Sequence, residues 1–150
     1  PLSQKITLPD GPLIVVANHS SHADSVALVA AIGRVRPVLV VSPRHRGHGL
    51  VTIVPLSSAA PPHAQPWHVP VPPGLYPPAR GPMWFKCDML ATVGLARLDR
   101  VRTGRIGTAR RYETFTASAD VMLAVRSGIA AAHRARTRAA RIRPIARKQP

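Results

Sequence analysis

Proline is concentrated in one part of the chain, and this limits what that part can form. Eleven of the 17 prolines lie between residues 43 and 82. Proline cannot donate a backbone hydrogen bond, so it is excluded from helix interiors and from central strands. Segments such as 61–63 and 70–74 are therefore predicted to lack helix and strand. We expect residues 43–82 to be irregular or disordered.

The clearest regular structure is predicted to precede this segment. Residues 13–17 form a continuous apolar run rich in β-branched side chains, which is typical of a strand buried on both faces of a parallel sheet. Residues 23–32 are rich in Ala, Val and Leu and end at Gly33, as helices often do. A second apolar run at 38–41 completes a βαβ unit with a right-handed crossover. The predicted fold class is α/β, a partial domain that begins with this unit.

The second half of the chain carries weaker signals. They indicate a short strand at 83–85, a helix or strand at 90–98, and a helix at 118–132 capped by Ser118 or Thr116. Residues 133–150 hold seven basic residues and no acid, which predicts a solvated basic tail. The length of 150 residues suits a single domain, 1–150. Because the chain starts at Pro1 without Met, we expect an excised domain or a fragment.

The charge is strongly one-sided. Lys and Arg number 21 against 6 acidic residues, for a net charge of +15. A field of this sign attracts phosphates in nucleic acid, in lipid headgroups or in acidic substrates, and charge alone does not choose among them. The single cysteine, Cys87, excludes an intramolecular disulfide and is predicted to be a small apolar residue. No apolar run reaches the ~20 residues of a membrane span.

A histidine and an aspartate five residues apart form the most distinctive polar pattern. His19 follows the predicted strand at 13–17, and Asp24 lies at the start of the predicted helix. Loops at the carboxyl ends of parallel strands hold the sites of open α/β sheets, and a helix N-terminus there favours anions. A carboxylate that holds one imidazole nitrogen leaves the other free to take a proton. The pair is therefore a candidate base.

The segment 18–24, Asn-His-Ser-Ser-His-Ala-Asp, resembles the first sequence block of the lysophosphatidic acid and glycerol-3-phosphate acyltransferase superfamily. The resemblance implies acyl transfer from an acyl-CoA or acyl-carrier-protein thioester to a lysophospholipid or glycerophosphate hydroxyl, without a metal or tightly bound cofactor. His19 would deprotonate the hydroxyl, Asp24 would orient His19, and Asn18 and Ser21 would contact substrate. It also implies a peripheral enzyme at the cytoplasmic face of a membrane, held by anionic lipid.

A second, shorter match and one missing block complete the resemblance. Residues 94–100 are similar to the family's second block, which implies that Arg100 binds the substrate phosphate. The third block, Phe-Pro-Glu-Gly-Thr-Arg, is expected near Gly128 and is absent. We therefore hypothesise that residues 43–82 and about 129–150 are out of frame or degenerate. On that hypothesis the chain could be an inactive acyltransferase remnant.

Other readings of the same residues are less favoured. His19 and His22 would form a metal pair only with further ligands, for which the candidates are His45, His48 and Asp88. Ser20 or Ser21 could act as a nucleophile beside His19, but no Gly-x-Ser-x-Gly elbow surrounds them. A nucleic-acid-binding module would explain the +15 charge, yet no recognition motif is visible and the arginines are not interleaved with aromatic residues. Nucleic acid is thus the alternative partner.

Overall fold

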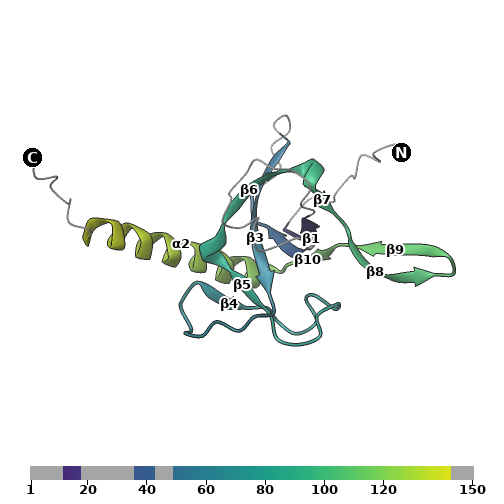
Figure 1. Ribbon diagram of the computed structural model, residues 1–150, viewed down its shortest axis with the longest axis horizontal. Coiled ribbons are helices and arrows are strands. Elements are labelled where there is room, and N and C mark those ends of the chain that lie inside the picture. The colour runs from purple at the N-terminus through teal and green to yellow at the C-terminus, as the bar shows by residue number, and fades with distance from the viewer. Residues whose placement is uncertain (1–11, 18–35, 43–48, 143–150) are drawn as a thin grey trace, which may run out of the picture.

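The described part of the chain is a curved β-sheet with one long helix (Figure 1). The computed structural model describes residues 12–17, 36–42 and 49–142. In chain order the elements are β1 (Leu13–Ala17), β2 (Arg36–Val40), β3 (Leu50–Ser57), β4 (His68–Pro70), β5 (Trp84–Lys86), the 3₁₀ turn η1 (Cys87–Met89), β6 (Ala91–Gly94), the 3₁₀ turn η2 (Leu95–Arg97), β7 (Leu98–Asp99), β8 (Val101–Ile106), β9 (Ala109–Glu113), β10 (Phe115–Thr116) and α2 (Ala119–Ile142).

The main sheet curls into a half-barrel. Its strand order is β10-β1-β2-β3-β5-β4, with β7 also paired to β1 and β6 also paired to β3. The segment from β6 to β7 therefore runs from the outer edge of β3 to the outer edge of β1. Every strand pairing within the described residues is antiparallel.

The predicted βαβ unit is wrong. β1 and β2 form where the two apolar runs predicted them, but they pair antiparallel, with Ile14 opposite Leu39 and Val15 opposite Val38. Residues 23–32, the predicted helix, lie outside the described residues. The fold is thus mostly antiparallel β-structure with a C-terminal helix, and not an α/β acyltransferase domain.

Two apolar clusters, one on each face of the sheet, explain why residues 13–15 are apolar without alternation. The cluster on the α2 face consists of Ile14, Leu39, Val54, Leu56, Phe85, Cys87, Ala117, Met122 and Val125. The cluster on the inner face of the half-barrel consists of Leu13, Val15, Val38, Val40, Val51, Ile53 and Leu98. Successive residues of a strand point to opposite faces, so a strand covered on both sides is apolar throughout. An antiparallel strand meets this condition here because a helix covers one face and the curled sheet covers the other.

The prediction that residues 43–82 are irregular is wrong for β3. Residues 50–57 form this central strand although it contains Pro55. On its outer edge β3 pairs with β6 as far as Ile53 and then with β5 from Leu56. Pro55 lies where the partner changes, so its missing N–H interrupts neither ladder on that edge. Between Ser57 and β5 the only regular element is β4.

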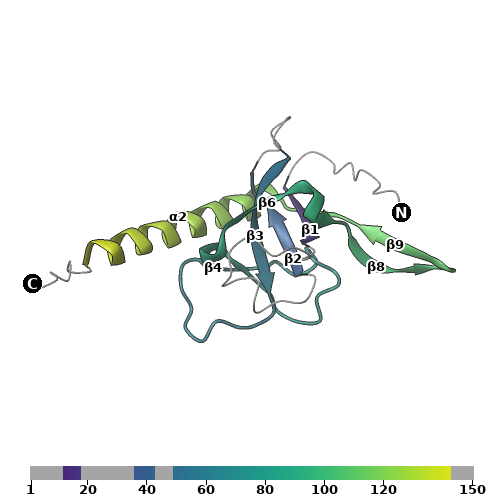
Figure 2. The same cartoon turned by 45° about the horizontal axis from the view of Figure 1, so that its top comes forward.

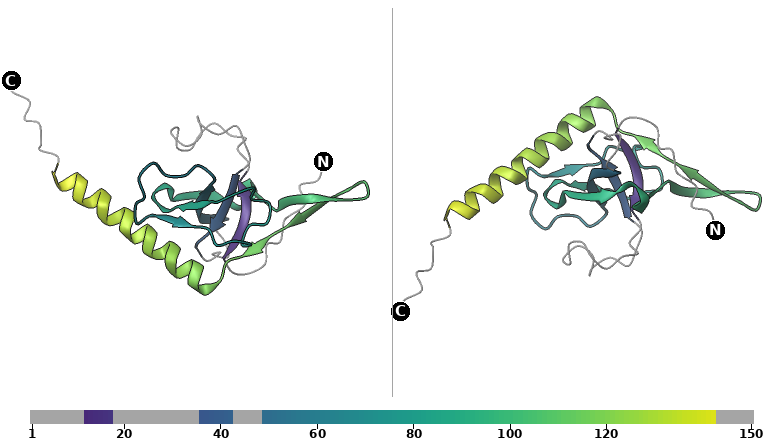
Figure 3. Two further views of the ribbon diagram at one scale, coloured as in Figure 1. Left: turned by 90° about the horizontal axis from the view of Figure 1, so that it is seen from below. Right: turned by 90° about the horizontal axis from the view of Figure 1, so that it is seen from above.

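Helix α2 confirms the predicted helix and extends it. The backbone N–H of Val121 donates to Ser118 Oγ over 3.3 Å, which makes Ser118 the N-cap. Gly128 packs so closely that an added Cβ would lie 2.9 Å from Cys87 Sγ. The helix continues to Ile142, so residues 133–142 are not the predicted tail, and Arg136 donates from its guanidinium to the Asp88 carbonyl. Figures 2 and 3 show its C-terminal half extending beyond the sheet.

No helix in the described ranges combines the length and the apolar character that a bilayer crossing requires.

Cys87 gives a testable pH dependence of stability. The thiol is buried beside α2, as predicted for a small apolar residue, and its burial, with Asp88 adding to it, raises its pKa to about 11. The folded state therefore holds this proton more tightly than the unfolded chain does. We expect the free energy of unfolding to fall as pH rises from about 9 to about 11. Urea unfolding across this range should show a shallower fall for Cys87→Ala, and parallel curves for the two proteins would refute the assignment.

Candidate nucleic-acid interface

The polar end of the half-barrel is built by the ends of three strands. β2 begins at Arg36 and β3 ends at Ser57, so their antiparallel pairing brings both residues to the same end of the sheet. Ala17, the last residue of β1, lies opposite Arg36. Along β2 the inner face changes from the buried Val38 to the half-buried Arg36. At this end of the half-barrel the buried apolar residues are followed by a half-buried, positively charged arginine.

The same face continues across β5 and β4 with further polar and aromatic groups. Ser57 lies opposite Trp84, and Lys86 lies opposite His68. Between them, Phe85 and Val69 point to the α2 side and join its core. Since residues opposite each other in an antiparallel pair share a face, the inner face carries the row of half-buried residues Arg36, Ser57, Trp84, Lys86 and His68.

This inner-face row combines the groups that hold single-stranded nucleic acid. Cationic side chains attract phosphates, and an aromatic ring offers a stacking surface to a base of any sequence. His68 Nδ1 is buried and has no hydrogen-bond partner in the described part of the chain. No acidic residue belongs to the row.

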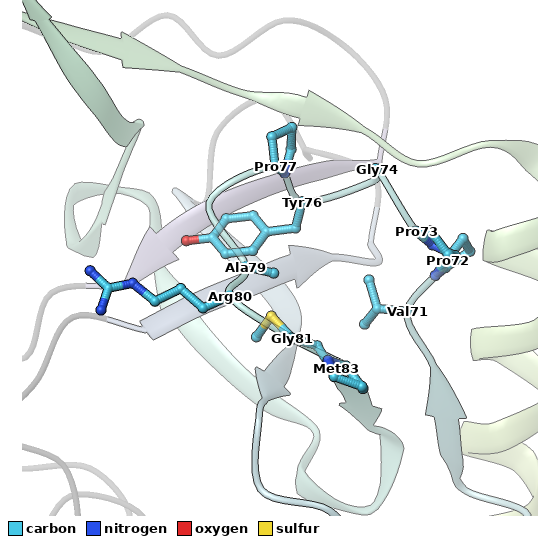
Figure 4. Close-up of a pocket in the computed structure, with 11 residues that line it drawn as sticks. Val71, Pro72, Pro73, Gly74, Tyr76, Pro77, Ala79, Arg80, Gly81 and Met83 are labelled. Atoms are coloured by element: carbon cyan, nitrogen blue, oxygen red, sulfur yellow. The ribbon is translucent and has the colours of Figure 1, made fainter.

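A cavity of about 570 Å³ lies within the proline-rich loop that joins β4 to β5 (Figure 4), and its lining residues Val71, Tyr76 and Met83 pack against the cluster on the α2 face. The ring of Tyr76 lines it and packs edge-on against Phe115, with the ring centroids 5.9 Å apart. Burial raises the pKa of the Tyr76 hydroxyl, which stays a neutral hydrogen-bond donor at physiological pH. Its volume lies within the range of small-molecule pockets.

The residues predicted from the sequence are only partly placed. His19, Asp24, Asn18 and Ser21 lie outside the described residues, so their arrangement stays a prediction. Arg100 is exposed between β7 and β8, and its guanidinium carbon lies 5.8 Å from the centroid of the Tyr112 ring. Within the described ranges no group of three His, Cys, Asp or Glu residues is arranged to hold a metal ion.

The inner-face row was missed because its members are far apart in sequence. Arg36, Ser57 and Trp84 are brought together by strand pairing alone. The Gly107-Thr108 pair between β8 and β9 was a usable hairpin signal, since Gly107 has a φ of 60° in a two-residue loop.

Comparison with known proteins identifies the family. The family model described as PemK-like, MazF-like toxin of type II toxin-antitoxin system matches residues 13–132. The Mycobacterium tuberculosis toxin MazF-mt6 is 18% identical over 81% of this chain and 95% of that chain, with a TM-score of 0.53. MazF from Deinococcus radiodurans is 23% identical over 83% of this chain and 94% of that chain, also with a TM-score of 0.53. These two structures share the fold. A comparison with curated proteins gives no match.

These matches correct the assignment made from the sequence. The resemblance to the acyltransferase superfamily rested on residues 18–24 and 94–100, whereas the toxin-family match spans both and everything between them. Acyl transfer, the lipid and thioester substrates and the anionic membrane partner are therefore wrong, and the nucleic-acid-binding alternative fits better. The absent third block is no sign of a frameshift, because the chain is not an acyltransferase. The chain belongs to the family of PemK-like, MazF-like toxins of type II toxin–antitoxin systems.

Proposed function

We propose that this chain is an endoribonuclease that cleaves messenger RNA and is restrained by an antitoxin protein. The observation that carries the proposal is the family match over residues 13–132, which spans the half-barrel and most of α2. The inner-face row supports it independently, because cations and an aromatic ring share a surface that lacks acids. The acyl-transfer roles given to His19 and Asp24 are abandoned with that reaction.

The chemistry needs charge stabilisation at one phosphate. In RNA, the 2′-hydroxyl oxygen can form a bond to the adjacent phosphorus while the bond from phosphorus to the 5′-oxygen breaks. The 2′-hydroxyl loses its proton, and the departing 5′-oxygen gains one. Negative charge builds on the phosphate oxygens, where a planar guanidinium binds with two hydrogen bonds. We assign this phosphate-binding role to Arg36, which lies at the polar end of the half-barrel.

The neighbouring residues of the row would position the strand. Ser57 carries a hydroxyl at the same end as Arg36 and can donate to a phosphate oxygen. Trp84 offers a ring for base stacking, and Lys86 offers a charge for a following phosphate. Because the 2′-hydroxyl is the nucleophile, this reaction requires no metal or cofactor, and we expect cleavage to continue in EDTA.

The antitoxin follows from the family and from charge. Type II systems pair a toxin with a second component, and a chain of net charge +15 favours an acidic segment as its partner. Such a segment on the inner-face row would compete directly with RNA phosphates. Release of cleavage inhibition by high salt would be consistent with this competition.

Incubation of the purified chain with a long single-stranded RNA tests the proposal. We expect discrete fragments in the presence of EDTA, and no cleavage of single-stranded DNA of the same sequence, because DNA lacks the attacking hydroxyl. End-group analysis should show that the 5′-fragment keeps the phosphate and that the 3′-fragment begins with a free 5′-hydroxyl. Intact RNA after incubation with the folded chain in excess would reject the proposal.

A further inference from the structure

The β8–β9 hairpin is set apart from the half-barrel. It forms a two-stranded sheet of its own. Figures 1 to 3 show it projecting away from the main sheet, on the side opposite the free end of α2. Its root is anchored by Val101, which is buried. From there outward it presents both of its faces to solvent along most of its length.

Four arginines and a tyrosine share one face of this hairpin. Register places Arg102 opposite Tyr112 and Arg105 opposite Arg110. Arg110 and Tyr112 are alternate residues of β9, so these four side chains lie on the same face. Arg100 stacks its guanidinium over the Tyr112 ring and joins them. We call these five residues the arginine face.

The opposite face of the hairpin is electrostatically balanced. Arg111 lies there and forms an ion pair with Glu113. On the arginine face, by contrast, Arg102, Arg105 and Arg110 have no ion pair within residues 12–17, 36–42 and 49–142. Like charges directly opposite each other destabilise a strand pair, and Arg105 and Arg110 are in that position. An anion between them would remove this cost.

The arginine face begins beside the proposed cleavage site. Ala17 lies opposite Arg36 on one side and opposite Leu98 of β7 on the other. Arg100 follows Leu98 by two residues. An RNA strand whose phosphate binds Arg36 therefore has a short path, past Ala17 and Leu98, to Arg100 and the hairpin. The six residues of β8 extend this path by about 20 Å, which is enough to contact several nucleotides.

We propose that the arginine face binds the phosphates of single-stranded RNA flanking the cleavage point. The inference rests on the proposed function and extends it from the chemistry to the length of the RNA footprint. The arginines supply charge, and the guanidinium of Arg100, which lies over the Tyr112 ring, supplies a surface for stacking. A two-stranded ribbon also fits the major groove of B-form DNA, so duplex DNA is the competing ligand.

The test compares two double variants with equal loss of charge. Arg105→Gln/Arg110→Gln changes the arginine face, and Arg134→Gln/Arg138→Gln changes exposed residues of α2. Binding to an uncleavable 2′-O-methyl RNA 20-mer is measured at several salt concentrations. If both hairpin arginines contact phosphates, the slope of log Kobs against log salt should become shallower by about 1.4, with a smaller change in the α2 variant. Thermal unfolding should show that the hairpin variant is at least as stable as the wild type.

Cleavage kinetics separate this inference from the proposed function. The hairpin variant should raise KM for a 20-mer RNA while leaving cleavage of a short RNA of three or four nucleotides unchanged. If the wild type cleaves RNA and the hairpin variant has the same salt slope and the same KM as the wild type, the inference is overturned and the proposed function stands. Loss of duplex-DNA binding with RNA binding intact would assign the face to DNA instead. If the wild type cleaves no RNA, the proposed function fails. The salt dependence of RNA binding by the two double variants then still tests whether the arginine face binds phosphates.

Discussion

Replacement of Arg36 by alanine is expected to lower the rate of RNA cleavage by about 10²–10³-fold, the usual loss when one group that stabilises transition-state charge is removed. The effect should fall mainly on kcat, because the charge that Arg36 meets grows as the bond to the 5′-oxygen breaks. Gel-based initial rates on a fluorescent RNA over a range of concentrations separate kcat from KM.

Two further variants sharpen the Arg36 result. Arg36→Lys keeps the charge but loses the planar pair of donors, so its rate should lie between those of the wild type and the alanine variant. Arg126→Ala removes an exposed arginine from α2, on the other side of the sheet, and should leave kcat unchanged. Equal kcat in the wild type and in a folded Arg36→Ala protein would remove Arg36 from the reaction.

Replacement of Phe85 by alanine should lower the free energy of unfolding by about 3–5 kcal/mol. Phe85 is fully buried in the cluster between the sheet and α2, where it packs with Leu56 and Val125. The loss combines the transfer of a large apolar side chain with the cavity that it leaves. Since domains are stable by only about 5–15 kcal/mol, this change alone could unfold the protein at 37 °C. Urea unfolding followed by circular dichroism measures it.

A surface leucine provides the comparison for Phe85. Leu123 lies on α2 with 66% of its surface exposed, so Leu123→Ala should change the free energy of unfolding by less than about 0.5 kcal/mol. Phe85→Leu, which keeps most of the apolar volume, should lie between the two alanine variants. A Phe85→Ala protein as stable as Leu123→Ala would show that this cluster is not the core of the fold.

Local sequence patterns located several elements correctly. The apolar runs near residues 13–17 and 38–41 are the strands β1 and β2, and Ser118 caps the predicted helix. These predictions depend on neighbours in sequence: β-branched side chains suit extended backbone, and a serine hydroxyl satisfies a helix N–H. The direction in which β1 and β2 pair depends on the chain between them and on what covers each face, and neither is a property of the runs themselves.

The acyltransferase assignment was wrong because the fold and function of the whole chain were inferred from a short motif. The pattern at residues 18–24 has few constrained positions, so unrelated sequences produce it. The toxin-family match extends over residues 13–132 and includes buried strands, which constrain many more positions. The prediction that residues 43–82 are irregular was wrong at β3 for a similar reason. Proline is generally excluded from central strands, but Pro55 is tolerated because β3 changes its pairing partner there.

By itself the sequence determined the positive field, the positions of β1, β2 and α2, and the burial of Cys87, since each depends on composition or on adjacent residues. Only the tertiary structure decided which charges act together. Arg36, Ser57 and Trp84 meet because antiparallel pairing joins strands that are distant in the chain, and the arginine face exists because register sets Arg105 against Arg110. The register of long-range strand pairing is set by which apolar side chains become buried. That register also fixes the positions of the polar residues at the ends of the strands.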